Sequence, residues 1–446
     1  MATVEATHIV RPAEATPDEI MYLNAGDQIK DILHTPTLYF YKHSAVLDAI
    51  DAVSRLKDSL GKALVPFYPL AGRLSWAAEG GGRVELHCRG QGVPIFEAHS
   101  DAAVEDFGDF RPTPAMLPFI PSVDYTAPIH EIPMLIVQLT RLRCGGVTVG
   151  LGFSHVVADG SSALHFVGEW AKIARGVGPA VPPYLDRKAL EADTPPISEF
   201  DAAVLGPMPT LLGQEDDPDE QEKPVAVALL SLSKTLIEKL RGKANLGLDN
   251  ASCRGYSRFE AVAAHIWRCT SKARGHAAEQ PTGLFFVADF RKRLNPPLPE
   301  NYFGNALFRV VVTEKSGSLL SNPISAASRK IREAVEKVTD DAVRGYMDYL
   351  KKLPDVGRFR SLDSEGRPKR GLLGNPNVVI ISWAALPLLG TDFGWGKEMN
   401  VGPGPIGLDG KSYILPGDGG DGGLNVAIWL QEDHLDEFKK CFYDDI

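Results

Sequence analysis

Residues 147–160, VTVGLGFSHVVADG, decide how the middle of the chain folds. Apolar residues first occupy every second position, which is the spacing of a strand with one buried face. Asp159 and Gly160 then supply a helix cap and a sharp turn, and apolar residues recur at helical spacing over residues 164–173. The stretch therefore predicts a half-buried strand, a tight loop and a helix, with His155 at the end of the strand.

Strand and helix patterns alternate on both sides of this stretch, which predicts a mixed α/β chain. The helical patterns cover residues 45–61, with Gly61 as the expected end, residues 258–271, residues 324–352 and the residues after Glu432. Strand patterns cover residues 284–289, 378–382 and 424–430.

A break in these patterns divides the chain. Between residues 193 and 224 they give way to prolines, glycines and an acidic run, which is typical of a crossover or linker. We therefore expect two domains of similar size, residues 1–192 and 225–446, joined by the linker 193–224.

The composition excludes several classes of protein. The 446 residues carry 47 Lys and Arg against 57 Asp and Glu, a formal charge of −10, which argues against general binding of nucleic acid or anionic membrane. The five cysteines have no zinc-type spacing, so we expect no metal and a reducing compartment. No secretory signal and no apolar run of roughly 20 residues is visible. A monomeric cytoplasmic protein is expected.

Motifs of several common phosphate-binding and hydrolytic sites are absent from the sequence. No P-loop, GxSxG elbow or HExxH motif is present. Gly402, Gly404 and Gly407 match GxGxxG as a string, but Pro403 and Pro405 interrupt it and no helix pattern follows. Dinucleotide binding is therefore not expected.

His155 and Asp159 form an HxxxD string, which occurs by chance in chains of this size. Two interpretations stand: a structural histidine beside a helix-capping Asp159, or a general base, since an imidazole titrates near neutrality. Gly160 permits the sharp reversal that turns His155 away from the core.

Several motifs resemble the plant BAHD acyl-CoA-dependent acyltransferases along nearly the whole chain. HVVADG at residues 155–160 and DFGWG at residues 392–396 are similar to the two signatures of that family. Further similar segments are HTPTLYFY at 34–41, FYPLAGRL at 67–74, YSRFEAVAAHIWR at 256–268, NYFGN at 301–305 and the closing FKKCFYDDI. The resemblance implies two chloramphenicol-acetyltransferase-like α/β domains, a long crossover and an active-site channel between the domains.

The resemblance also implies roles for the residues of the first signature. His155 is expected to be the base that deprotonates the acceptor in a direct, ternary-complex transfer. Asp159 is expected to hold the loop through a salt bridge to Arg291 in the segment DFR. Trp383 matches a tryptophan beside the reaction centre of the family, where its N–H can donate to the developing oxyanion; a core tryptophan is the alternative.

The resemblance assigns other residues a structural role or a contact with the substrates. The DFGWG residues Asp392, Gly394, Trp395 and Gly396 are expected to shape the coenzyme channel from a distance. The expected acyl- or acceptor-binding residues are His34, Thr37, Tyr39 and Ile381, the last replacing a threonine of shikimate-type members; those for coenzyme A are Ser257 and Arg258. Acyl-CoA is the expected co-substrate, with no permanently bound cofactor.

The sequence leaves alternatives for the acceptor, the molecule that receives the acyl group. Several segments resemble spermidine hydroxycinnamoyltransferases, which predicts N-acylation of a polyamine or another amine, with Asp418 and Asp421 as possible channel carboxylates. O-acylation of shikimate, quinate or another alcohol is the alternative. It ordinarily calls for an arginine fork, and Arg367 or Arg370 cannot be aligned with one. A non-catalytic binding protein of the family is the second alternative.

Overall fold

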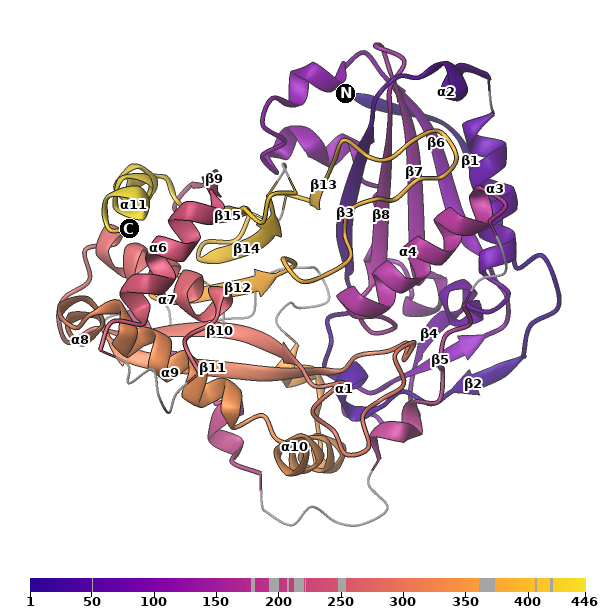
Figure 1. Cartoon of the computed structure of the whole chain (residues 1–446). Coiled ribbons are helices and arrows are strands. Elements are labelled where there is room, and N and C mark those ends of the chain that lie inside the picture. Colours follow the sequence, from indigo (N-terminus) through magenta and orange to yellow (C-terminus); the bar gives the residue numbers. More distant parts are fainter. Residues whose placement is uncertain are drawn as a thin grey trace.

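The computed structural model describes most of the chain as two lobes that face each other (Figure 1). The described residues are 1–49, 51–177, 181–191, 200–206, 208–211, 220, 222–247, 254–360, 374–405, 407–417 and 420–446. Strands of these residues form one large sheet in each lobe and a small sheet of β2 (Glu19–Met21), β5 (Val84–Cys88) and β4 (Arg73–Trp76).

The first lobe is built on a sheet that the signature loop leaves at one end. Helices α3 (Ala52–Ala63) and α4 (Gly160–Ala174) cover one face, where Leu56, Leu60 and Phe166 are fully buried. The strands in spatial order are β1 (Ala2–Val10), β6 (Val93–Ser100), β7 (Leu135–Leu142), β8 (Val147–Ser154), β3 (His34–Tyr41) and β13 (Asn400–Pro403).

The second lobe packs helices on one face of its sheet and turns the other face to the first lobe (Figure 1). Its strands in spatial order are β11 (Leu307–Lys315), β10 (Pro281–Asp289), β12 (Val378–Ser382), β14 (Lys411–Pro416), β15 (Leu424–Gln431) and β9 (Val225–Leu232). Its helices include α6 (Lys234–Ala244), α7 (Arg258–Ala273), α8 (Ser316–Ser321), α9 (Ile324–Glu336) and α11 (Glu432–Asp444).

Strand β13 crosses between the lobes. It follows β12 of the second sheet in sequence but pairs antiparallel with β3 of the first, with Val401 opposite Tyr39. The first lobe therefore contains a segment from the last part of the chain. Most of the linker 193–224 lies outside the described residues, so the division into residues 1–192, 193–224 and 225–446 stays a prediction.

In the structure, each of two predicted helices is divided into two shorter helices. Residues 324–352 form α9 and α10 (Asp340–Lys352), because the Thr339 side chain accepts from the Ala342 N–H and starts a new helix. Residues 45–63 form α2 (Ala45–Ala49) and α3, whose N-cap is Asp51.

Gly61 does not end α3, contrary to the prediction. The residue lies within the helix at a close approach to the first strand, because a Cβ there would lie 3.2 Å from the Arg11 carbonyl oxygen. A glycine at this point marks chain packing and not a helix end.

The helices also bear on whether the chain can cross a membrane. Among the described residues, none combines the length and the apolar character that crossing a bilayer requires.

Candidate active site

His155 lies where the first lobe meets the second. It follows β8 directly and precedes α4, as the sequence predicts. Strand β8 differs from the prediction, because it is buried on both faces. The reason is Gly150 and Gly152, whose missing side chains let the Phe119 carbonyl and Ile136 pack against the second face. The loop of residues 155–160 therefore starts from a strand that is covered on both faces.

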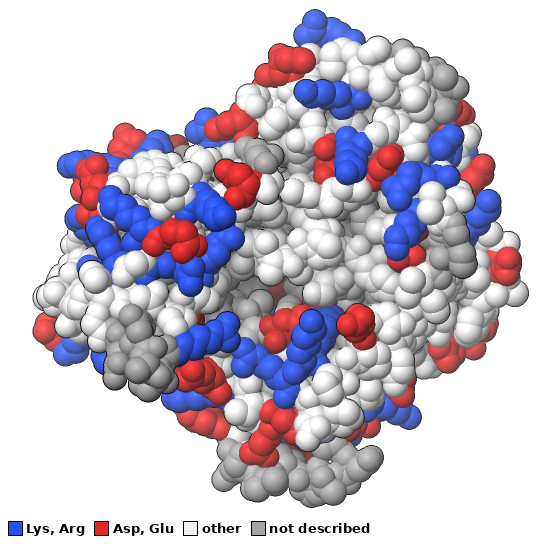
Figure 2. Space-filling view, in the orientation of Figure 1, with Lys and Arg blue, Asp and Glu red and all other residues white. Residues whose placement is uncertain are grey.

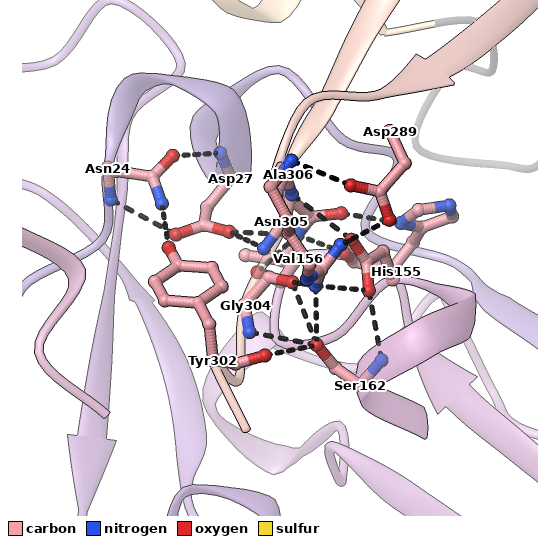
Figure 3. A network of polar contacts seen from close by, with 12 residues as sticks. Asn24, Asp27, His155, Val156, Ser162, Asp289, Tyr302, Gly304, Asn305 and Ala306 are labelled. Carbon is pink, nitrogen blue, oxygen red and sulfur yellow. Dashed lines mark hydrogen bonds and ion pairs between the residues drawn. The ribbon is translucent and has the colours of Figure 1, made fainter. Parts of the chain in front are cut away.

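Asn305 fixes the orientation and tautomer of the His155 ring (Figure 3). Its amide nitrogen donates to the His155 carbonyl oxygen at 2.9 Å and to Asp27 Oδ1 at 2.8 Å, so its Oδ1 is the acceptor. That oxygen lies 3.1 Å from His155 Nδ1, which must therefore carry the proton. Nε2 is left as the basic nitrogen, and no described residue is hydrogen bonded to it.

The electrostatic surroundings keep this imidazole neutral. Burial is the main cause that lowers the pKa of His155 below its ordinary value, and the positive charge of Lys30 lowers it further. A lowered pKa means that Nε2 is unprotonated at neutral pH. The ring is therefore ready to accept a proton, as a general base requires.

Asp159 and Arg291 form a two-pronged ion pair across the lobes. The distances are 2.8 Å from Arg291 Nη1 to Oδ2 and 2.9 Å from Nη2 to Oδ1, and the Asp159 side chain is 1% exposed. Asp159 also accepts from the N–H groups of Ser162 and Ala306. Burial by itself would raise the pKa of Asp159, but Arg291 and these donors hold it below the ordinary value.

A second buried ion pair supports the network from behind and was not predicted from the sequence. Arg187 Nη1 lies 2.7 Å from Asp27 Oδ2, and both side chains are 0% exposed. Asp27 lies in α1 (Ala25–Gln28) and forms a capping box with Asn24, a spacing that the sequence NAGD displays. Asp27 thus connects Arg187 to Asn305. Figure 3 shows Asp27 bonded to Asn305, and Asn305 bonded to His155.

Trp383 follows β12 on the face of the second sheet that points to the first lobe. Its ring makes an edge contact with Tyr413 at 5.2 Å between centroids, and its side chain is 9% exposed. Within the described part of the chain, its indole N–H has no acceptor. The following loop reaches the catalytic loop, since a Cβ on Gly160 would lie 3.1 Å from Leu386 Cδ1. Ile381 is partly buried on the same strand.

The surface between the lobes is hollowed (Figure 2). At the end of β10, a cavity of about 300 Å³ lies against Arg291. Its lining residues are Ser161, His165, Asp289, Arg291, Lys292, Glu300 and Tyr302.

The DFGWG segment forms a turn that packs on the first lobe. Asp392 Oδ1 accepts from the N–H groups of Gly394 at 2.7 Å and Gly396 at 3.0 Å, and both glycines have φ above 100°. Phe393 contacts Trp170 of α4, with ring centroids 4.7 Å apart, and Trp395 is 4% exposed. The segment is therefore an aromatic anchor.

The predicted acyl-binding residues of β3 differ in their surroundings. Tyr39 is 0% exposed in the core of the first lobe, and its contact with an acyl group stays a prediction. His34 uses both ring nitrogens, with Tyr125 Oη at 2.9 Å and the Pro133 carbonyl oxygen at 2.8 Å, and burial lowers its pKa to about 4. Thr37 is partly buried and remains a candidate.

The predicted coenzyme and acceptor residues have structural contacts or are not described. Ser257 caps α7, and Arg258 donates to the Gly422 carbonyl oxygen. Asp421 accepts from the Gly423 N–H at 2.8 Å within a turn. Arg367, Arg370 and Asp418 lie outside the described residues. In the rest of the chain, no group of His, Cys, Asp and Glu has the arrangement of a metal site.

Comparisons with known proteins agree with this geometry. The profile described as "Transferase family" matches residues 1–445. The chain is 43% identical to hydroxycinnamoyl-CoA:piscidic acid hydroxycinnamoyltransferase of Actaea racemosa, over 100% of both chains. It is 39% identical to shikimate O-hydroxycinnamoyltransferase of Nicotiana tabacum and 38% identical to a hydroxycinnamoyl-CoA:5-hydroxyanthranilate N-hydroxycinnamoyltransferase of Avena sativa, each over 99% of both chains.

Solved structures confirm the predicted fold of two chloramphenicol-acetyltransferase-like domains. Vinorine synthase matches with a TM-score of 0.72 at 22% identity, over 98% of this chain and 96% of that one. F. graminearum TRI101, solved with coenzyme A and T-2 mycotoxin, matches with a TM-score of 0.76 at 18% identity, over 95% and 97%. The chain belongs to the BAHD acyltransferases of the transferase family, enzymes that take acyl-CoA as co-substrate.

Proposed function

We propose that this enzyme transfers a hydroxycinnamoyl group from coenzyme A to a hydroxyl or amino group of a small acceptor, with His155 as the general base. The observation that carries the proposal is the His155 ring where the lobes meet, whose Nδ1 is bonded to Asn305 and whose Nε2 has no hydrogen-bond partner among the described residues. The acyl group is proposed from the relatives, whose names all specify hydroxycinnamoyl transfer.

The chemistry needs one proton acceptor and one oxyanion donor. Nε2 of His155 takes the proton from the acceptor as the acceptor oxygen or nitrogen bonds to the thioester carbonyl carbon. The carbonyl oxygen becomes an oxyanion, to which the Trp383 N–H is a suitable donor. The carbon–sulfur bond then breaks, and the coenzyme A thiolate takes the proton back from the imidazolium. Asp159 does not titrate in this scheme, since Arg291 holds it ionised.

The acceptor is open between oxygen and nitrogen. Among the relatives, piscidic acid and shikimate are acceptors of two, and 5-hydroxyanthranilate is acylated on nitrogen by a third. A polyamine, which the sequence resemblance favours, needs carboxylates near the base. Asp421 instead closes a turn, so the described residues lend a polyamine little support.

An acceptor panel tests the proposal. Purified enzyme receives p-coumaroyl-CoA and, in separate reactions, shikimate, piscidic acid, 5-hydroxyanthranilate, spermidine or tryptamine, with acetyl-CoA as the competing donor. We expect a coumaroyl ester or amide by liquid chromatography and mass spectrometry with at least one acceptor. Release of coenzyme A from acetyl-CoA alone, with no coumaroyl product from any acceptor, contradicts the proposed function.

A further inference from the structure

The buried pair of Asp27 and Arg187 reaches the surroundings of His155 through two separate contacts. Asp27 Oδ1 accepts from the side-chain amide of Asn305 at 2.8 Å, and this amide is the partner of the His155 ring. Arg187 Nη2 donates to the Val157 carbonyl oxygen at 2.7 Å, within the loop of residues 155–160. The pair therefore contacts both the partner of the ring and the loop that carries the ring.

The direction of the Asn305 amide decides which nitrogen of His155 carries the proton. Its Nδ2 faces three acceptors: Asp27 Oδ1, the His155 carbonyl oxygen at 2.9 Å and the Val156 carbonyl oxygen at 3.3 Å. An amide turned over would bring its Oδ1 against these three oxygens and would present Nδ2 to the ring. The ring would then have to accept at Nδ1, and its proton would lie on Nε2. Only the amide direction seen here leaves Nε2 basic.

Asp27 is the carboxylate among these three acceptors, and it has donors on both sides. Its Oδ1 accepts from the backbone and side-chain N–H groups of Asn305, and its Oδ2 accepts from the Asn24 N–H at 3.1 Å (Figure 3). Arg187 Nη1 lies 2.7 Å from the same Oδ2. An N–H bond to a carboxylate is stronger than one to a carbonyl oxygen, because the acceptor carries a charge. Asp27 therefore contributes most to the direction of the amide.

Arg187 also belongs to a stretch that is bonded to the chain before Asn305. The Tyr184 N–H donates to the Asn301 carbonyl oxygen, and the Tyr184 carbonyl oxygen accepts from the Phe303 N–H, both at 2.9 Å. The chain just before the linker and the chain that leads to Asn305 are therefore held together, and both end at the buried pair.

Stability alone does not explain an ion pair at this place. Both side chains are 0% exposed, so both charges lost their hydration on folding. Apolar side chains of similar volume often stabilise a buried site as well as an ion pair does, or better. What the pair adds is direction, since a carboxylate accepts only donors and a planar guanidinium donates along fixed lines.

We propose that Asp27 and Arg187 are positioning residues of the acyl transfer, which keep the proton of neutral His155 on Nδ1 and leave Nε2 basic. Asp27 acts through the Asn305 amide, and Arg187 acts by holding the Asp27 carboxylate and the loop in place. Neither residue touches a substrate in this scheme. The inference rests on the proposed function, since it names the residues that prepare the same base.

Two variants of the pair test the proposal. Asp27→Asn keeps the size of the side chain, but its single carbonyl oxygen cannot serve donors on both sides. Because the charged Arg187 competes for that oxygen, the new amide should turn its N–H groups to Asn305 and reverse the Asn305 amide. Asp27→Leu/Arg187→Met removes both charges together and leaves no unpaired buried charge.

The matched control is Asp409→Leu/Arg274→Met. Asp409 and Arg274 form an ion pair of 2.8 Å in the second lobe, with 10% and 0% of the side chains exposed. Their other hydrogen bonds go to Asn377 and Gln431, not to the network of His155. The control therefore removes an equally buried ion pair that is not bonded to the base.

The first measurement reads the tautomer of His155 in the enzyme without ligands. Nuclear magnetic resonance of protein with isotope-labelled histidine distinguishes a ring with Nδ1–H from one with Nε2–H, and the His155 signal is the one lost in His155→Ala. We expect Nδ1–H in wild type and in the control, and a substantial population of Nε2–H in both variants of the pair.

The second measurement is steady-state kinetics with p-coumaroyl-CoA and an acceptor from the panel. Both variants of the pair should lower kcat per folded molecule roughly 10- to 100-fold, as expected when a charge-assisted hydrogen bond that orients the base is lost. The KM values for both substrates should change little, since neither residue touches a substrate. The control should keep the wild-type kcat per folded molecule.

Three results would overturn the inference. The first is a wild-type His155 ring with its proton on Nε2, which is decisive even where a variant does not fold. The second is a folded variant of the pair that keeps either the Nδ1–H tautomer or the wild-type kcat. The third is an equal loss of kcat in the control, which would assign the pair to stability alone. If the acceptor panel shows no transfer, the proposed function fails, and the tautomers still decide this inference.

Discussion

The two signature loops lie at opposite ends of α4 and are held by different means. The loop of residues 155–160 is held by directional polar contacts to the second lobe, Asp159 with Arg291 and His155 with Asn305. The loop of residues 392–396 comes from the later part of the chain but packs by its aromatic rings on the first lobe.

The two kinds of contact suit different tasks, the first orienting a side chain and the second anchoring a loop. Hydrogen bonds fix the direction of a ring and the position of its proton, which aromatic contacts do not. In the first loop the Asp159 carboxylate and Nδ1 of His155 are bonded, and Nε2 of His155 has no hydrogen-bond partner among the described residues. In the second loop Phe393 is 0% exposed and Trp395 is 4% exposed, so these side chains have almost no surface to offer a substrate.

The largest expected effect is that of His155→Ala. The substitution removes the base, so kcat should fall roughly 10²- to 10⁴-fold. The melting temperature should stay close to that of wild type, because His155 is only partly buried. Steady-state rates and thermal unfolding check both statements. A variant that keeps more than a tenth of the wild-type kcat would show that another group takes the proton.

Asp159→Ala should act on stability as well as on rate. It leaves Arg291 as a buried charge without its main partner, so unfolding in urea should lose about 3 to 5 kcal/mol. Asp289→Asn is the matched control, because Asp289 also contacts Arg291, at 3.1 Å, but with 44% of its side chain exposed. Its cost should be about 0 to 1 kcal/mol. Equal losses in the two variants would contradict the role given to burial.

The pH dependence of the Asp159 variant has a definite sign. The folded state holds the pKa of Asp159 below its ordinary value, so the ion pair stabilises the protein above the pKa of an unfolded aspartate, about 3.9. The stability difference between wild type and Asp159→Ala should shrink as the pH falls through the folded pKa. A difference that grows toward acid pH would be inconsistent with the pair.

Trp395→Leu tests the anchoring loop. Removing a buried indole that contacts Tyr41 at 5.8 Å should cost about 2 to 3 kcal/mol of unfolding free energy. The kcat per folded molecule should be unchanged, because this ring does not touch the reacting groups. Trp76→Leu, at an exposed tryptophan, should cost about 0.5 kcal/mol or less. A large fall of kcat in the folded variant would give DFGWG a direct role in the reaction.

The smallest effect is on the pH profile of Lys30→Met. The charge of Lys30 lowers the pKa of His155, so its removal should raise that pKa. A general base works only when neutral, so the acid limb of kcat should move to higher pH. The measurement is made at saturating substrates, and Lys62→Met, at an exposed lysine of α3, should leave the acid limb in place. A limb that moves to lower pH would contradict the electrostatic coupling.

Much of the local structure was predictable from residue patterns. The order of strand, loop and helix around His155, helix α7 and strands β12 and β15 appear where the spacing predicts them. Errors arose where a polar cap interrupts an apolar pattern, as at Thr339 between α9 and α10. The role of Tyr39 stays a prediction, because the resemblance that suggested it does not show which side chains meet a substrate.

The sequence by itself determined the fold class, the family and the candidate histidine, because periodicity and short motifs are properties of neighbouring residues. Only the tertiary structure decided that Asn305 sets the tautomer of His155 and that β13 joins the first sheet. It also decided that Arg187 and Asp27 form a buried ion pair behind Asn305. The physical reason is that these contacts join residues far apart in the chain, and no local pattern records which distant side chains will share a desolvated site.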